Sequence, residues 1–143
     1  MEMVRKAAYF TLEILDGFLA LSALFGGIGL LTGLNAPPID VLKGSLFIDY
    51  TIPGLSLFCI VGGSALLATI LTIRKNRFAI LVSIVISIII MFFEFTEALT
   101  IGSPPGIAQA LQIFYFGLGI VIAIISIGIW FIDLLSTSKP ASV

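Results

Sequence analysis

The sequence predicts an all-α integral membrane protein, a bundle of four spanning helices with both the N-terminus and the C-terminus in the cytoplasm. Three observations predict this fold. Of the 143 residues, 59% are hydrophobic and only 10% are charged, whereas about a quarter of a soluble domain is charged. The charged residues divide the chain into four long apolar runs. Most Lys and Arg residues also fall on one side of the topology that these runs define.

The four apolar runs are each long enough for a helix that crosses about 30 Å of hydrocarbon. They cover residues 16–34, 53–73, 78–101 and 107–132. Arg5 and Lys6 precede the first run as they would in a signal peptide, but Glu13 and Asp16 interrupt where the signal core would lie, so we expect a retained helix. The connections after the second and third helices are short, which predicts one transmembrane domain over residues 1–143.

The segments between and after the helices differ in character. Residues 35–52 form an outer loop that mixes apolar residues with Asp40, Lys43 and Asp49. This loop is long enough to cover the outer mouth of the bundle as a short helix or a partly inserted lid, and equally suits an interfacial connector. The GSPPG turn ends the third helix and begins the fourth, and the tail at 136–143 is expected to be disordered.

The distribution of positive charge predicts the orientation. The RKNR turn at residues 74–77 cannot be buried in lipid, and the positive-inside rule places it in the cytoplasm. Four spans then put both termini on the same side, with only Lys43 outside, in a multi-pass protein of the plasma (inner) membrane. The Lys and Arg residues expected inside are Arg5, Lys6, Arg74, Lys75, Arg77 and Lys139.

Small side chains on the first and last helices predict tight packing. In lipid, helices associate where small residues let their backbones approach, because no hydrophobic effect drives one helix onto another. Such stripes consist of Ser22, Gly26, Gly29 and Gly33 on the first helix, and of Gly119, Ala123 and Ser126 on the last.

Two acids in the third helix need a compensating partner. Counted along the helix, Glu94 lies about 24 Å across a core of about 30 Å, and Glu97 lies at its outer boundary. Both share a face with Ser83 and Ser87, which predicts a polar stripe directed into the bundle. The acids repel each other near the negative end of the helix dipole. A protonated carboxyl, a bound cation, Lys43 or the start of the fourth helix would compensate them.

Further polar residues are expected at the same depth. Gln109 and Gln112 share one face of the fourth helix, and Asp49 and Tyr50 directly precede the second. Two interpretations stay open: an outward-facing site for a proton, cation or small polar ligand, or a hydrogen-bond network that fixes the third and fourth helices. We interpret Glu13 and Asp16 as the cytoplasmic start of the first helix, where Arg5, Lys6 or the basic turn would pair with them.

Several functional classes are excluded by composition. Seven Lys and Arg residues against eight Asp and Glu leave no positive surplus for nucleic acid. The chain has no His and a single Cys, and it contains no nucleophile-base pairing or cluster of metal ligands. We therefore expect no cofactor, no metal and no enzymatic activity.

The most distinctive string is Ile-Asp-Tyr-Thr-Ile-Pro-Gly-Leu at residues 48–55, followed by the pair Gly62 and Gly63. It resembles a segment of small prokaryotic four-helix membrane proteins in which an acidic aromatic loop leads through Ile-Pro-Gly-Leu into the second helix. The resemblance implies this architecture and a prokaryotic source, and it implies no mechanism. Physically, Pro53 is tolerated in the first turn of a helix, where its missing N–H is no loss. The carboxylate of Asp49 just ahead can interact favourably with the exposed backbone amides of that turn.

Two functions fit these observations. The first is a homo-oligomeric transporter, channel or sensor whose site combines Glu94, Glu97, Gln109, Gln112, Asp49 and Tyr50. The alternative is an accessory or assembly subunit whose small-residue faces dock on a larger membrane complex.

Overall fold

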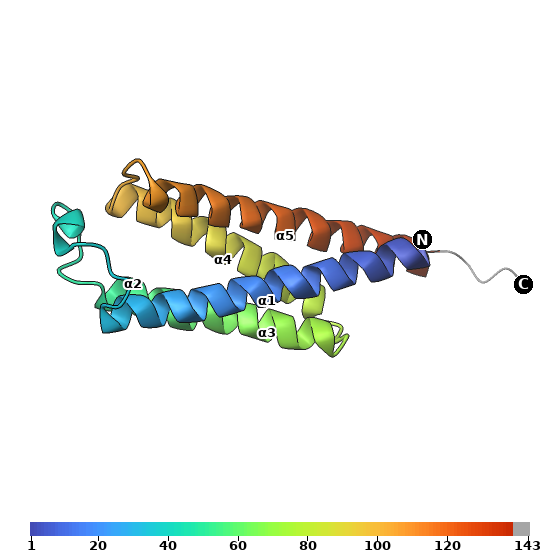
Figure 1. Ribbon diagram of the computed structural model, residues 1–143. Coiled ribbons are helices and arrows are strands. Elements are labelled where there is room, and N and C mark those ends of the chain that lie inside the picture. Colours follow the sequence, from blue (N-terminus) through green and yellow to red (C-terminus); the bar gives the residue numbers. More distant parts are fainter. Residues whose placement is uncertain (139–143) are drawn as a thin grey trace, which may run out of the picture.

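The computed structural model describes residues 1–138, and this part of the chain contains helices, turns and loops without β-strands. Four helices are long and apolar enough to cross a membrane, so the all-α prediction is confirmed. The second of them is continuous over Thr51–Ile73 and has a π-helical middle part, η2. The elements are α1 (Glu2–Thr32), the 3-10 helix η1 (Ile39–Leu42), α2 (Thr51–Leu55), η2 (Ser56–Gly62), α3 (Gly63–Ile73), α4 (Ala79–Thr100) and α5 (Ile107–Thr137) (Figure 1).

The first and last helices, α1 and α5, are longer than the apolar runs that predict them. α1 begins at Glu2 and has 31 residues, which corresponds to about 46 Å. α5 also has 31 residues and ends at Thr137, so the expectation of a disordered tail is wrong for Ser136 and Thr137. The part of that tail from Lys139 onward lies outside the described residues. The two long helices are joined near these ends, where Arg5 Nε donates to Asp133 Oδ1 at 2.6 Å.

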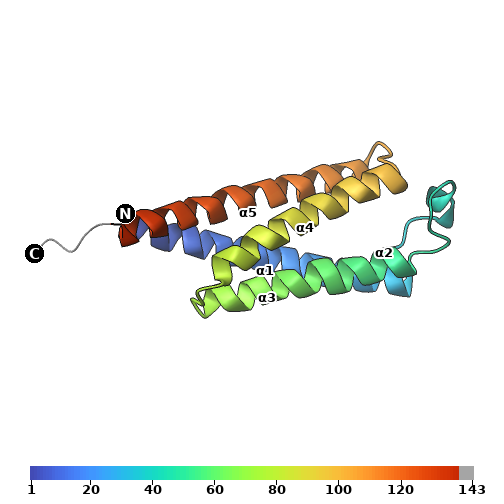
Figure 2. The ribbon, with the colours of Figure 1, turned by 180° about the vertical axis from the view of Figure 1, so that it is seen from behind.

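The helices form two antiparallel pairs. α1 packs along the second helix (α2, η2 and α3), and α4 packs along α5. We call the end with the N-terminus, the α3–α4 turn and the end of α5 the terminal end, and the opposite end, with residues 33–50 and the α4–α5 turn, the loop end. Both ribbon views show the two pairs diverging toward the loop end (Figures 1 and 2).

Glycines bring α1 and the second helix into close contact. A Cβ atom added to Gly27 would lie 2.6 Å from the Cβ of Phe58 and 2.9 Å from the carbonyl oxygen of Gly54. A Cβ on Gly62 would lie 2.8 Å from Cδ2 of Leu24. Real Cβ atoms are not accommodated at such distances, so these backbones can approach only because the side chains are absent.

The packing glycines differ in part from the stripe that the sequence predicts. Gly119 lies at the contact between α4 and α5, where a Cβ would meet the Ser87 carbonyl oxygen at 3.0 Å, while Ala123 is half-buried. A Cβ added to Gly26 would lie 3.2 Å from Cδ2 of Leu57.

The last two glycines of the predicted stripe lie at the end of α1. A Cβ added to Gly29 would lie 3.0 Å from the Cβ of Asn35, so Gly29 packs against the segment that follows its own helix. Gly33 ends α1 with φ 77°, a left-handed conformation that glycine adopts without strain. Gly33 therefore terminates the helix and does not pack against another one.

The contact at Gly27 yields a stability prediction. Gly27→Ala should lower the free energy of unfolding by about 1–3 kcal/mol, because the added methyl group meets backbone atoms that cannot rotate away. Gly128→Ala is the matched control, since a Cβ at Gly128 has no neighbour within 4 Å. The measurement is the thermal unfolding midpoint in detergent, and equal midpoints for the two variants would contradict the packing.

Candidate functional site

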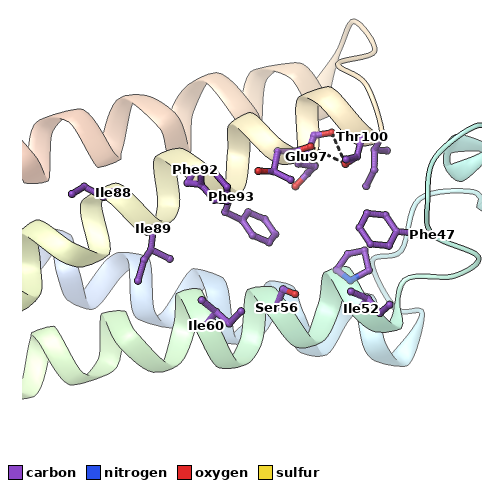
Figure 3. Close-up of a pocket in the computed structure, with 13 residues that line it drawn as sticks. Phe47, Ile52, Ser56, Ile60, Ile88, Ile89, Phe92, Phe93, Glu97 and Thr100 are labelled. Carbon is purple, nitrogen blue, oxygen red and sulfur yellow. Dashed lines mark hydrogen bonds between the residues drawn. The ribbon is translucent and has the colours of Figure 1, made fainter.

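The divergence of the helix pairs leaves a cavity of about 490 Å³ at the loop end, between the second helix and α4 (Figure 3). Its walls are mainly apolar. Thirteen residues line it: Phe47, Ile52, Pro53, Ser56, Ile60, Ile88, Ile89, Phe92, Phe93, Thr96, Glu97, Thr100 and Ile101.

Aromatic rings and isoleucines shape most of this cavity. Phe92 and Phe93 come from α4, whereas Phe47 comes from the loop between α1 and α2 (Figure 3). The loop therefore contributes a wall of the cavity. Isoleucines of η2 and α4 line the part farthest from the loop, halfway along α4, and they are Ile60, Ile88 and Ile89.

Glu97 is the charged residue among the thirteen that line the cavity. The other polar lining groups are hydroxyls, and that of Thr100 is already engaged, because Oγ1 donates to the carbonyl oxygen of Thr96 at 2.8 Å. Ser56 lies on the opposite wall, in the π-helical segment (Figure 3). The site thus combines a large apolar volume with one carboxyl group at its loop end.

Gln112 connects this carboxyl group to α5. Its Nε2 donates to Glu97 Oε1 at 3.3 Å and to the carbonyl oxygen of Gly102 at 3.1 Å. The amide therefore links α5, α4 and the turn between them. The other amide atom, Gln112 Oε1, is buried and has no hydrogen-bond partner, so it remains available as an acceptor.

Glu94 lies one turn from Glu97 but outside the cavity lining. Its exposed fraction is 6%, and Ser83 and Ser87 on the same side of α4 are completely buried. The prediction that this polar stripe faces the bundle interior is confirmed. Among the hydrogen bonds of residues 1–138, none involves the Glu94 carboxyl group, so only Glu97 combines an interhelical hydrogen bond with access to the cavity.

The remaining residues of the expected cluster do not line the cavity. Gln109 is half-buried. Asp49 is exposed and its Oδ1 accepts a hydrogen bond from the Thr51 amide at 2.9 Å, which supports the start of α2. Lys43 pairs with Asp40 at 2.7 Å, so in this structure its charge does not compensate the acids of α4.

Tyr50 anchors the loop instead of entering the cavity. Its ring is buried, and its hydroxyl donates to the carbonyl oxygen of Pro38 at 3.4 Å. Burial raises the pKa of the Tyr50 phenol, and the negative charge of Glu97 raises it further. The phenol therefore stays neutral and keeps the proton with which it holds the loop.

Asp16 is a buried polar residue whose environment the sequence interpretation missed. Its side chain is completely buried, Ser83 Oγ donates to its Oδ2 at 2.6 Å, and its Oδ1 has no hydrogen-bond partner. The expected pairing with basic residues at the start of the helix is wrong. α1 begins much earlier, at Glu2, and Arg5 is bonded to Asp133.

A periodic signal for this burial is present in the sequence. Leu12, Asp16, Leu19 and Ala23 follow one another at steps of four, three and four residues, and all four are buried. This is the spacing of one helix face, so the acid belongs to the core-facing stripe of α1. Because Ser83 lies on α4, the hydrogen bond joins the two helix pairs on the terminal side of the cavity.

No protein-family model, curated protein or solved structure matches this chain. The resemblance to small prokaryotic four-helix proteins therefore stays a prediction. Over residues 1–138, no group of three or more His, Cys, Asp and Glu residues is placed to hold a metal ion.

The bond between Asp16 and Ser83 yields a second stability prediction. Ser83→Ala should lower the free energy of unfolding by about 1–3 kcal/mol, because both carboxyl oxygens of Asp16 then lack a partner. In a protein that already carries Asp16→Leu, Ser83→Ala should lower the free energy of unfolding by less, because no carboxyl group is then left without a partner. A double-mutant cycle on thermal unfolding measures the coupling, expected at about 0.5–3 kcal/mol, and strictly additive effects would contradict the interaction.

Proposed function

We propose that this chain is a multi-pass protein of the plasma (inner) membrane that binds a small amphiphilic cation in the cavity at its loop end. Four long apolar helices support the insertion. Large apolar side chains on the outside of the bundle support it further, since Phe25 and Leu99 each expose about 70% of their surface. Such a surface suits lipid and is unfavourable in water.

The charge distribution supports a cytoplasmic terminal end. Among the described residues, Lys43 alone carries a positive charge at the loop end. By the positive-inside rule both termini then lie in the cytoplasm, and the cavity lies toward the outer side of the membrane. The positive residues of the terminal end are Arg5, Lys6, Arg74, Lys75 and Arg77.

The chemistry of the cavity favours an amphiphilic cation over a hydrated ion. Apolar walls cannot replace the hydration shell of a small ion, but they stabilise an apolar ligand body. The faces of Phe47, Phe92 and Phe93 attract a cation that is close to them, and Glu97 supplies the opposite charge. The observation that carries the proposal is therefore the apolar cavity with a single carboxyl group in its wall.

The position of the cavity favours a transporter or a sensor over an open channel. The lining reaches only halfway along the bundle, to Ile60 and Ile88, and α3 and α4 come into contact beyond it. A ligand between the two helix pairs would change how far they diverge. In a sensor this movement would transmit a signal, and in a transporter it would let the ligand pass further across the membrane. We propose a homo-oligomer, because four helices enclose little volume.

An accessory subunit of a larger membrane complex is the second candidate. Gly63 and Gly117 are helical glycines at which an added Cβ would have no neighbour within 4 Å. A helix surface with an uncovered glycine lets a helix of another chain approach closely. Native mass spectrometry of the protein extracted from its source membrane distinguishes the candidates, because an accessory subunit retains a stoichiometric foreign chain.

The ligand proposal is tested with tetraphenylphosphonium, using tetraphenylborate as an anion of the same shape. In lipid nanodiscs, we expect the cation to bind and the anion not to bind. Glu97→Gln should weaken binding of the cation tenfold or more, about 1.4 kcal/mol, because the opposite charge is lost. Isothermal titration calorimetry measures the dissociation constants.

Asp49→Asn is the matched control for this experiment. It removes an acid at the same end of the bundle that is exposed and does not line the cavity, and it should leave the affinity unchanged. Equal binding of the two ions, or an unchanged affinity after Glu97→Gln, would contradict the proposed ligand class.

A further inference from the structure

A second cavity, of about 550 Å³, lies at the terminal end. Its walls come from three separate parts of the chain: the start of α1, the turn between α3 and α4 with the first part of α4, and the end of α5. It lies at the opposite end of the bundle from Glu97 and shares no lining residue with the first cavity.

Positive charge predominates in its lining. Arg5, Lys75 and Arg77 contribute three positive charges, and Asp133 contributes one negative charge, which leaves a net charge of two positive. Asp133 is engaged by Arg5 Nε at 2.6 Å and by the Tyr9 hydroxyl at 3.3 Å. Within the described part of the chain, Lys75 and Arg77 form no salt bridge, so their charges are available to an anion.

Apolar side chains of α4 and α5 form much of the remaining lining. Ile80, Leu81 and Ile84 of α4 continue the wall toward the middle of the bundle. On the α5 side, Trp130 and Leu134 each expose about half of their surface. The cavity is therefore amphipathic, with cationic groups at the α3–α4 turn and apolar side chains deeper along the helices. Trp at such a boundary is typical of the interface between lipid and water.

We propose that this cavity binds an anionic phospholipid. Its phosphate would lie at Lys75, Arg77 and the side-chain amide of Asn76. Its acyl chains would lie along Leu81, Ile84 and Leu134. Lys and Arg side chains donate charge-assisted hydrogen bonds to phosphate oxygens, and basic pockets between helices on the cytoplasmic side suit anionic headgroups. The apolar half of the lining favours a lipid over free phosphate, because only a lipid covers it.

A lipid in this position would contact separate elements of the fold. It would touch the α3–α4 turn on one side and the end of α5 on the other. The inference depends on the membrane insertion and orientation proposed above, and it is independent of the ligand proposed at Glu97.

The test compares phosphatidylglycerol with phosphatidylcholine added to the purified full-length protein in detergent. Native mass spectrometry and the thermal unfolding midpoint report binding. We expect phosphatidylglycerol to bind and raise the midpoint, and the variant with Lys75→Gln and Arg77→Gln to lose roughly tenfold or more of this affinity. Lys75→Arg with Arg77→Lys keeps both charges and should retain binding.

The matched control removes two positive charges of the same end outside the cavity lining, by Lys6→Gln with Arg74→Gln, and should keep the affinity. An equal loss in this control, equal binding of phosphatidylcholine, or the same stabilisation by inorganic phosphate alone would overturn the proposal. Binding of tetraphenylphosphonium should be unchanged in the Lys75 and Arg77 variants, so a failure of either proposal is recognised separately.

Discussion

The close approach of helices at glycine residues is the constraint on which the rest of the structure depends. Gly27 allows α1 to contact the backbone of Gly54 and Phe58, and Gly119 allows α5 to contact Ser87 of α4. In lipid, where the hydrophobic effect does not drive helices together, such contacts decide which helices pair. The space between the two pairs contains the apolar cavity at the loop end.

The connections between the pairs are unevenly distributed along the bundle. Arg5 and Asp133 join α1 to α5 at the terminal end, and Asp16 and Ser83 join α1 to α4 closer to the middle. At the loop end, the hydrogen bond from Gln112 to Glu97 lies within one pair. The pairs are thus held together on one side and separate on the other, where the apolar cavity and its carboxyl group lie. The bond to Asp16 carries particular weight, because a buried acid without a partner is costly in a membrane.

Local patterns predicted the helices, and the inward-facing stripe of Ser83, Ser87 and Glu94, because both depend on apolar run length and helical phase. They did not predict how far α1 extends, since polar side chains near its start resemble a helix boundary, and this error placed Asp16 at the surface. The cavity was not predictable for another reason: it depends on how two pairs diverge and on where the loop brings Phe47, and neither leaves a periodic signal in the sequence. The expected cluster of Glu94, Glu97, Gln109, Gln112, Asp49 and Tyr50 therefore contains one residue of the cavity lining, Glu97, and none of its apolar walls.

The divergence of the pairs is tested most directly by cysteine labelling in lipid nanodiscs, with native Cys59 replaced by Ser. Ser56 lies on the cavity wall, whereas Ser87 is completely buried between α4 and α5. If the pairs separate at the loop end, Ser56→Cys reacts with a small apolar maleimide and Ser87→Cys does not. Equal protection of both positions would mean that the pairs close on each other at the loop end, and it would contradict the cavity and the function proposed from it.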